Sequence, residues 1–160
     1  MKRETIFNAD HSHRFQLWRE WGMFNPRFVQ FIGLNPSTAN ATEDDPTIRR
    51  CIGFAKQWGF GALCMTNLFT MVTPFPSELI RSGERCVPVK TWMLIQVGRR
   101  AGKIICCWGN FKAARFAETE TKAALIDAGL LPFVLGLNSS GSPKHPLYLP
   151  KTTMPQPWML

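Results

Sequence analysis

Apolar and polar residues alternate along the chain in a way that predicts short strands separated by helices. Residues 28–33 form a nearly continuous apolar run, which is typical of a strand covered on both faces. Similar runs over residues 62–69, 103–108 and 131–137 predict three further buried strands. Glycine, proline or asparagine occurs within five residues after each of the four runs, so each strand is expected to end in a loop.

An earlier segment, Arg14–Arg19, alternates strictly and predicts a strand with two different sides. Leu17 and Arg19 fall on one side of this strand, and Arg14 falls on the other. The following residues, Gly22–Pro26, have the composition of a turn.

Three segments have apolar residues at helical spacing. The clearest helix starts after Asp45, because an aspartate before Pro46 matches an N-cap followed by proline at the first helical position, and it ends at Gly59. Two more helices are predicted over Pro88–Arg100 and Phe111–Ala128.

Strands that alternate with helices predict an α/β fold. We expect a three-layer α/β/α domain with a four-stranded, mainly parallel sheet, formed by residues 1–160 as a single domain. Residues 1–27 are expected to add an N-terminal strand or hairpin, and residues 143–160 an extended, proline-rich tail. In such sheets, ligands bind beyond the carboxyl ends of the strands.

Composition excludes several classes of protein. The chain has 160 residues, of which 45% are hydrophobic, so it is long enough for one domain with a proper core and is too apolar to be disordered. No apolar run approaches the ~20 residues that cross a bilayer. The five cysteines include no Cys-x-x-Cys pair, so we expect buried thiols in a soluble, cytoplasmic protein.

The charge is strongly basic and unevenly distributed. The formal net charge is +8, and residues 81–160 contain 11 basic and 4 acidic residues. A basic field attracts polyanions, so nucleic acid, and DNA in particular, is the expected partner. No membrane contact and no cofactor are expected. His11 and His13 lack a third ligand nearby in sequence, so no metal site is predicted.

A few side chains near the predicted strand ends could take part in chemistry. Asn35 could hold a water molecule or stabilise an Asx turn, and His145 could donate a hydrogen bond near neutral pH. Of the two carboxylates before Pro46, Asp44 is the catalytic candidate, because Asp45 already caps the helix. Phe69 and Trp108 lie at strand ends where a base could stack.

Four short motifs, taken in order, resemble those of the uracil-DNA glycosylase superfamily. They are Phe31–Ser37, Thr66–Phe69, Cys107–Gly109 and His145-Pro146. The first resembles the superfamily's water-activating Gly-x-Asn-Pro-Ser loop, and the last resembles the start of its His-Pro-Ser-Pro-Leu-Ser loop. The chain departs from this pattern because no Ser-Pro-Leu-Ser follows Pro146 and because an asparagine, in place of aspartate, precedes Pro36.

This resemblance implies a role for each matching residue. The protein would flip a base out of the nucleic acid and cleave its N-glycosidic bond. Asn35 would orient the attacking water, with Asp44 nearby, and His145 would stabilise the departing base. Asn67 would read the base edge. The remaining candidates contact the nucleic acid backbone or fill the gap left by the base: Ser37, Thr38, Ser139, Ser140 and Lys144 for phosphate, and Leu147 or Tyr148 as a wedge.

Residues 14–158 more closely resemble a bacterial and phage family of unknown function. Its marks are the segments Leu34–Ala39, Asp44–Cys51 and His145–Pro150. Two alternatives to the DNA glycosylase therefore stay open. One is a module that binds DNA or a nucleotide without turnover, and the other is an N-glycosidase that acts on free nucleosides or nucleotides. In each case, the side chains of Asn35, Asn67 and His145 are expected to meet in one cavity with room for a planar ring.

Overall fold

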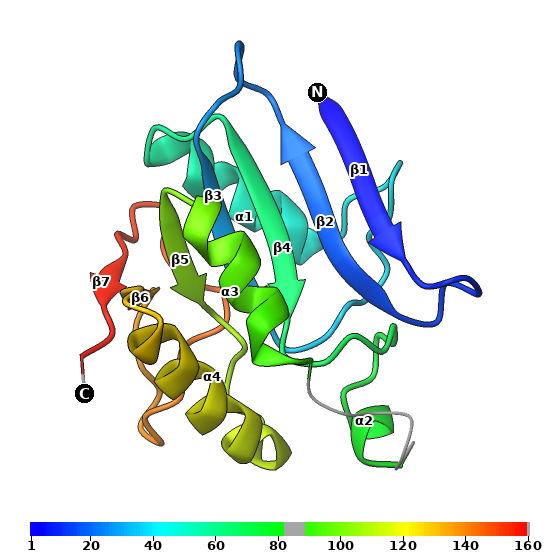
Figure 1. Ribbon diagram of the computed structural model, residues 1–160, viewed down its shortest axis with the longest axis vertical. Coiled ribbons are helices and arrows are strands. Elements are labelled where there is room, and N and C mark those ends of the chain that lie inside the picture. The colour runs from blue at the N-terminus through cyan, green and yellow to red at the C-terminus, as the bar shows by residue number, and fades with distance from the viewer. Residues whose placement is uncertain (82–88, 160) are drawn as a thin grey trace.

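A seven-stranded mixed sheet forms the centre of the molecule in the computed structural model, which describes residues 1–81 and 89–159 (Figure 1). The elements in chain order are β1 (Lys2–Phe7), β2 (Arg14–Glu20), β3 (Phe28–Gly33), α1 (Pro46–Gln57), β4 (Ala62–Asn67), α2 (Ser77–Arg81), α3 (Thr91–Arg100), β5 (Lys103–Cys106), the short 3-10 helix η2 (Lys112–Ala114), α4 (Arg115–Asp127), β6 (Pro132–Val134) and β7 (Gln156–Pro157).

The expectation of a four-stranded sheet is wrong. The strand order is β1-β2-β4-β3-β5-β6-β7, in which β4, β3, β5 and β6 are parallel and the other three strands pair antiparallel. The β1–β2 hairpin pairs with β4, and β7 of the C-terminal tail pairs with β6. These additions satisfy the hydrogen-bonding groups that would otherwise be exposed along both edges of the parallel strands. An α/β fold is therefore confirmed, with a larger and mixed sheet.

Helices cover both faces of the sheet, because successive side chains of the buried strands point to opposite faces. Val29 and Phe31 pack with Cys51 and Phe54 of α1 on one face. On the other face, Ile32 and neighbouring side chains pack with residues of α3 and α4. Figure 1 shows α1 behind the sheet and α3 with α4 in front of it.

The predicted helices agree with the structure, whereas the last predicted strand is shorter than expected. Asp45 caps α1 as predicted, since its carboxylate accepts a hydrogen bond of 2.9 Å from the Ile48 N–H. The predicted helix over 88–100 is α3, although Pro88 lies outside the described residues. The strand expected over 131–137 is regular only from Pro132 to Val134, and Gly136 then turns the chain with a φ of 149°, so that Leu137 forms an isolated bridge to Pro143.

A bulge in β2 changes the direction of one important side chain. Ile6 pairs with Gln16, but Phe7 pairs with Arg14, so Phe15 is an extra residue in β2. Such a bulge breaks strict alternation and re-aims the side chains beyond it. Arg14 and Arg19, which alternation places on opposite sides, therefore both reach the loop that precedes α1, where they donate to the carbonyls of Ala39 and Asn40.

The C-terminal segment is not extended throughout, contrary to expectation. A turn includes Leu147 and Tyr148, and Tyr148 has a φ of 68°, which is a left-handed conformation. Two hydrogen bonds anchor the segment before this turn to the ends of the central strands: Gly109 N–H donates to the Pro143 carbonyl, and Lys144 N–H donates to the Gly136 carbonyl. This anchoring places His145 beside the end of β5.

Candidate functional site

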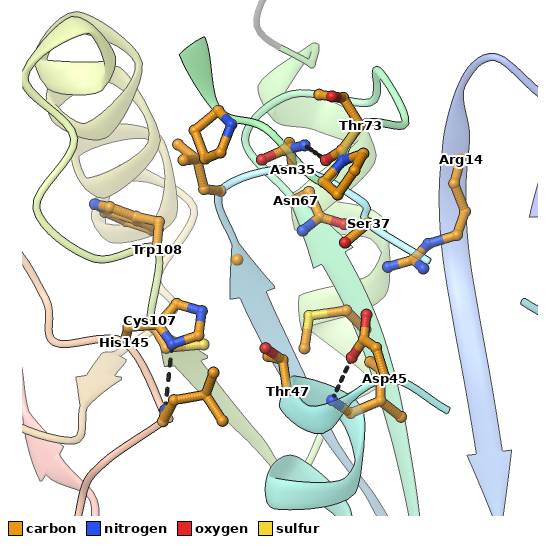
Figure 2. Close-up of a pocket in the computed structure, with 17 residues that line it drawn as sticks. Arg14, Asn35, Ser37, Asp45, Thr47, Asn67, Thr73, Cys107, Trp108 and His145 are labelled. Carbon is orange, nitrogen blue, oxygen red and sulfur yellow. Dashed lines mark hydrogen bonds between the residues drawn. The ribbon is translucent and has the colours of Figure 1, made fainter. Parts of the chain in front are cut away.

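A cavity of about 250 Å³ lies at the carboxyl ends of β3, β4 and β5 (Figure 2). An apolar cavity of ~150 Å³ accommodates benzene, so this space is large enough for a six-membered ring with substituents. The cavity is lined by Arg14, Gly33, Leu34, Asn35, Ser37, Asp45, Thr47, Ile48, Met65, Asn67, Thr73, Pro74, Pro76, Cys107, Trp108, His145 and Leu147. The expected meeting of Asn35, Asn67 and His145 in one cavity is therefore observed.

Asn35 is held in one orientation by main-chain carbonyls. Its Nδ2 donates to the carbonyls of Thr73 at 2.8 Å, Pro36 at 2.9 Å and Met71 at 3.4 Å. Figure 2 shows this amide nitrogen directed at Thr73. Because carbonyl oxygens require a donor, the amide cannot be flipped, and Oδ1 is left as an acceptor without a partner among residues 1–81 and 89–159.

Asn67, the last residue of β4, presents an unpaired amide to the cavity. The residue is only 6% exposed, yet its side chain makes no hydrogen bond to any described residue. Buried amides are nearly always hydrogen-bonded, so this one is suited to a ligand. Gly33 makes room for it, because a Cβ at that position would lie 2.9 Å from Asn67 Nδ2.

His145 is fixed as a hydrogen-bond donor toward the cavity. Its Nδ1 accepts the Leu147 N–H at 3.2 Å, so the proton of the neutral ring is on Nε2. Figure 2 shows the other ring nitrogen on the side of the ring that faces the cavity. Burial lowers the pKa of His145 below its ordinary value of 6.5, an effect that the charge of Asp45 partly opposes. The imidazole is therefore neutral at physiological pH.

Arg14 lines the opposite side of the cavity and is only 3% exposed. Its Nη1 donates to the Ala39 carbonyl at 3.0 Å, whereas its Nε is buried with no partner. Burial lowers the pKa of Arg14 to about 10, although the charge of Asp45 acts against this. The sequence did not indicate this residue, because only the bulge at Phe15 turns it toward the cavity.

The two aspartates before α1 have different surroundings, and only Asp45 lines the cavity. Asp44 pairs with Arg19 at 2.7 Å and with Arg3 at 2.9 Å, and it does not line the cavity. Burial raises its pKa, but hydrogen bonds from the two arginines outweigh this, so the pKa lies below its ordinary value. Asp45 is the carboxylate at the cavity, in addition to capping α1. The sequence does offer Asp45 as one of the two carboxylates before Pro46, but helix capping explains its position equally well.

Two residues at the end of β5 complete the wall. Burial raises the pKa of the Cys107 thiol to about 12, so it is protonated at neutral pH and is a poor nucleophile. Trp108 lines the cavity as well, with its ring packed edge-on against Trp158. Its position is compatible with the predicted contact to a base, which stays a prediction.

Other predicted residues lie away from the cavity. Phe69 is buried in the core on the α3–α4 face, so it is not placed to stack on a ligand there. Ser140 donates to Asn110 Oδ1 at 2.9 Å and lines a separate hollow beside α4. Thr38, Ser139 and Lys144 are exposed and do not line the cavity. Strand-end loops thus diverge beyond their first residues, which composition does not reveal.

The predicted wedge residues lie next to the cavity in the turn that follows His145. Leu147 lines both the cavity and a neighbouring groove on α1, which is formed with Pro46, Gly53 and Phe54. Three cations, Arg49, Arg50 and Lys151, border the same groove. Tyr148 is 96% exposed, so its ring projects into solvent.

The described part of the chain contains no group of three His, Cys, Asp or Glu side chains that could hold a metal ion. His13 Nδ1 lies 2.9 Å from Thr70 Oγ1, and His11 stacks on Phe7. Cys51, Cys64, Cys106 and Cys107 are buried and free of disulfides. Among the helices formed by residues 1–81 and 89–159, none is long and apolar enough to cross a membrane.

Comparison with known proteins identifies the family to which the chain belongs. Residues 14–147 match the model of a family described as "Protein of unknown function (DUF1643)". The chain belongs to this family. No curated protein and no solved structure matches the chain. The match begins at Arg14 and ends at Leu147, and both residues line the cavity, so the whole cavity lies within the part of the DUF1643 chain that the family model covers.

Proposed function

We propose that this DUF1643 protein is a base-excising N-glycosidase that receives a flipped base in the cavity at the strand ends. The observation that carries the proposal is the meeting of Asn35, Asn67 and His145, which come from three distant segments and direct unpaired polar atoms at one cavity. The ordered motifs that resemble the uracil-DNA glycosylase superfamily support the same activity.

The base is held by Asn67 and stabilised by His145 as it leaves. The Asn67 amide offers a donor and an acceptor side by side, which complements the amide-like edge of a nucleobase. When the bond between the sugar C1′ and the base nitrogen breaks, the base keeps the electron pair and becomes negative. The neutral His145 donates its Nε2–H to this charge without transferring a proton, as donors in oxyanion sites do.

Asn35 and Asp45 orient the attacking water. Asn35 Oδ1 accepts a hydrogen bond from the water, and the carboxylate of Asp45 takes the proton that the water loses as its oxygen bonds to C1′. Asp45 thus takes the role that sequence reasoning gave to Asp44, because Asp44 is bound to Arg19 and Arg3. The products are the free base and a hydrolysed sugar.

The surface beside the cavity suits a nucleic acid strand. Arg49, Arg50 and Lys151 can contact phosphates along the groove on α1, and the exposed ring of Tyr148 can replace the flipped base in the stack. Binding through such contacts weakens steeply as salt concentration rises. DNA is the proposed polymer because the ordered motifs resemble those of the uracil-DNA glycosylase superfamily.

Base release from defined oligonucleotides tests this activity. Duplexes and single strands that carry uracil, mismatched thymine or modified bases are incubated with the protein, and abasic sites are detected by alkaline cleavage. We expect at least one substrate to be cut, and His145→Ala to slow the reaction by about 10²–10³-fold. Asn67→Ala should also abolish discrimination between bases. His11→Ala and Asn110→Ala, at exposed positions away from the cavity, are the matched controls and should retain activity.

One observation favours a second candidate, a module that binds without turnover. Two of the three hydrogen bonds of the Asn35 amide nitrogen, to Met71 and Thr73, hold the 71–73 loop, so a structural role accounts for this residue without catalysis. Such a module would bind bases or nucleotides, lose affinity in Asn67→Ala and release no base from any substrate. Release from nucleosides or nucleotides but not from polymers would instead identify an enzyme of free monomers.

A further inference from the structure

A buried positive charge with unused donors lies in the cavity, and the base contacts proposed above do not employ it. Arg14 makes one side-chain hydrogen bond, from Nη1 to Ala39 O, while Nε is buried without a partner and Nη2 has no acceptor among the described residues. Removing a guanidinium from water is costly unless it is paired. An arginine that is 3% exposed and mostly unpaired is therefore suited to a negative ligand.

The groups around Arg14 are also donors without acceptors. Ser37 and Thr47 line the same cavity as Arg14, and neither hydroxyl makes a hydrogen bond to another described residue. Thr47 lies in the first turn of α1, a helix of 12 residues, and the start of a helix favours anions through its N–H groups and its dipole. Figure 2 shows Arg14 and Ser37 directed toward the same space.

Asp45 does not neutralise this charge. No ion pair joins Asp45 to Arg14 within the described ranges, although they are close enough for the Asp45 charge to affect the Arg14 guanidinium. One oxygen of Asp45 accepts the Ile48 N–H, which keeps the carboxylate at the start of α1. With its pKa at about 10, Arg14 stays protonated at neutral pH, so its charge is available to a ligand.

We propose that Arg14, Ser37 and Thr47 form a phosphate subsite, which holds the phosphate of the nucleotide whose base lies against Asn67. The substrate class is then a nucleotide, and not a free base or a nucleoside. This inference rests on the proposed function in taking a base as the ligand at Asn67. The phosphate has two possible sources, a free nucleoside monophosphate or the backbone of a strand, and the guanidinium fork recognises both.

Equilibrium binding without turnover tests the subsite. The full-length protein is titrated with the four common deoxynucleosides, their 5′-monophosphates, inorganic phosphate and short single-stranded oligonucleotides, and Kd values are measured by calorimetry. We expect at least one 5′-monophosphate or oligonucleotide to bind about tenfold or more tightly than the matching nucleoside, as charge-assisted hydrogen bonds imply. An advantage for monophosphates identifies free nucleotides as the source, whereas an advantage for oligonucleotides alone identifies a strand.

Variants assign the effect to the cavity. Arg14→Met should remove the phosphate advantage, Arg14→Lys should keep part of it, and Thr47→Val should reduce it severalfold. Arg99→Met, which removes the same charge from an exposed position in the last turn of α3, is the matched control and should change nothing. If Arg14→Met does not fold, Arg14→Lys and Thr47→Val still decide the question.

The result is separable from the test of base release. The subsite is refuted if nucleosides and their phosphorylated forms bind equally, or if Arg14→Lys and Thr47→Val both leave the advantage undiminished. A phosphate advantage without any base release would retain the subsite and reject the glycosidase. Base release with no phosphate advantage would do the reverse.

Discussion

The two ends of β2 each carry a buried arginine, and the two guanidinium groups differ in how completely they are paired. Arg19 donates from Nε to Asp44 at 2.7 Å, from Nη1 to the Trp18 carbonyl at 2.9 Å, and from Nη2 to the carbonyls of Asn40 and Glu43. Among the described residues, the Arg14 guanidinium donates only to the Ala39 carbonyl. Both residues reach the same loop from the same strand.

This difference separates a structural arginine from a candidate binding arginine. Where the protein supplies acceptors for all the donors, the cost of burying the charge is met internally and the group stabilises the loop. Where the acceptors are missing, the cost remains until a ligand supplies them. The Arg19 end of β2 is therefore expected to control stability, and the Arg14 end to control binding.

The largest expected effect is on stability at the Arg19 end. Arg19→Met should lower the free energy of unfolding by about 3–5 kcal/mol, because it leaves three carbonyls without this donor and Asp44 with only Arg3 as an ion-pair partner. Arg14→Met should change it by about 1 kcal/mol or less, because the loss of one hydrogen bond is offset by the removal of a poorly paired charge. Urea denaturation measures both.

The half-exposed Arg3 provides the control, since Arg3→Met removes an exposed ion pair with the same Asp44 and should cost under about 1 kcal/mol. Equal losses in Arg19→Met and Arg14→Met would show that the two ends do not differ in the proposed way.

The second effect compares the neighbouring aspartates. Asp44→Asn should destabilise the protein by about 1–3 kcal/mol, because Arg19 loses its charged acceptor. Asp45→Asn should cost less than about 1 kcal/mol, because asparagine is an equally good N-cap, but it should lower base release strongly. Denaturation curves and abasic-site assays on the same two variants give the comparison. The assignment of the proton acceptor fails if Asp45→Asn remains fully active.

The smallest expected effect is a loss of protein stability as pH falls, which is caused by His145 at the cavity. Because the folded pKa of His145 lies below 6.5, the unfolded chain binds a proton before the folded chain does as pH falls. This contribution to stability is thus complete above pH 6.5 and is lost as pH falls from 6.5 through the folded pKa. Asp44, whose folded pKa is lowered from 3.8, contributes above pH 3.8 and loses its effect only in stronger acid.

Thermal unfolding between pH 7 and pH 5 checks this window. The decrease in Tm should be smaller in His145→Gln than in the natural sequence, and His11→Gln should retain the full decrease as a matched control. An identical decrease in all three proteins would mean that His145 is not buried in the way described.

Much of the fold was predictable because its determinants are local. The buried strands are recognisable as apolar runs, and α1 from an Asp-Pro start with helical spacing, since these patterns depend on residues close in sequence. The antiparallel strands at the edges were harder to predict. The pairing of β2 with β4 joins Leu17 to Met65, and that of β7 with β6 joins Gln156 to Val134, so neither has a local signal.

For the site, the sequence pattern places Asn35 and Asn67 at strand ends that share one edge of a sheet, whereas the hydrogen bonds of Pro143 and Lys144 to neighbouring strand ends bring His145 to the same edge. The folded structure adds Arg14 and Asp45 to the cavity and leaves Asp44 and Phe69 outside it. One extra residue in β2 turns Arg14 toward the cavity, and the ion pair with Arg19 holds Asp44 away from it. Both features depend on segments that folding brings together, so partners distant in the chain set the direction of each side chain.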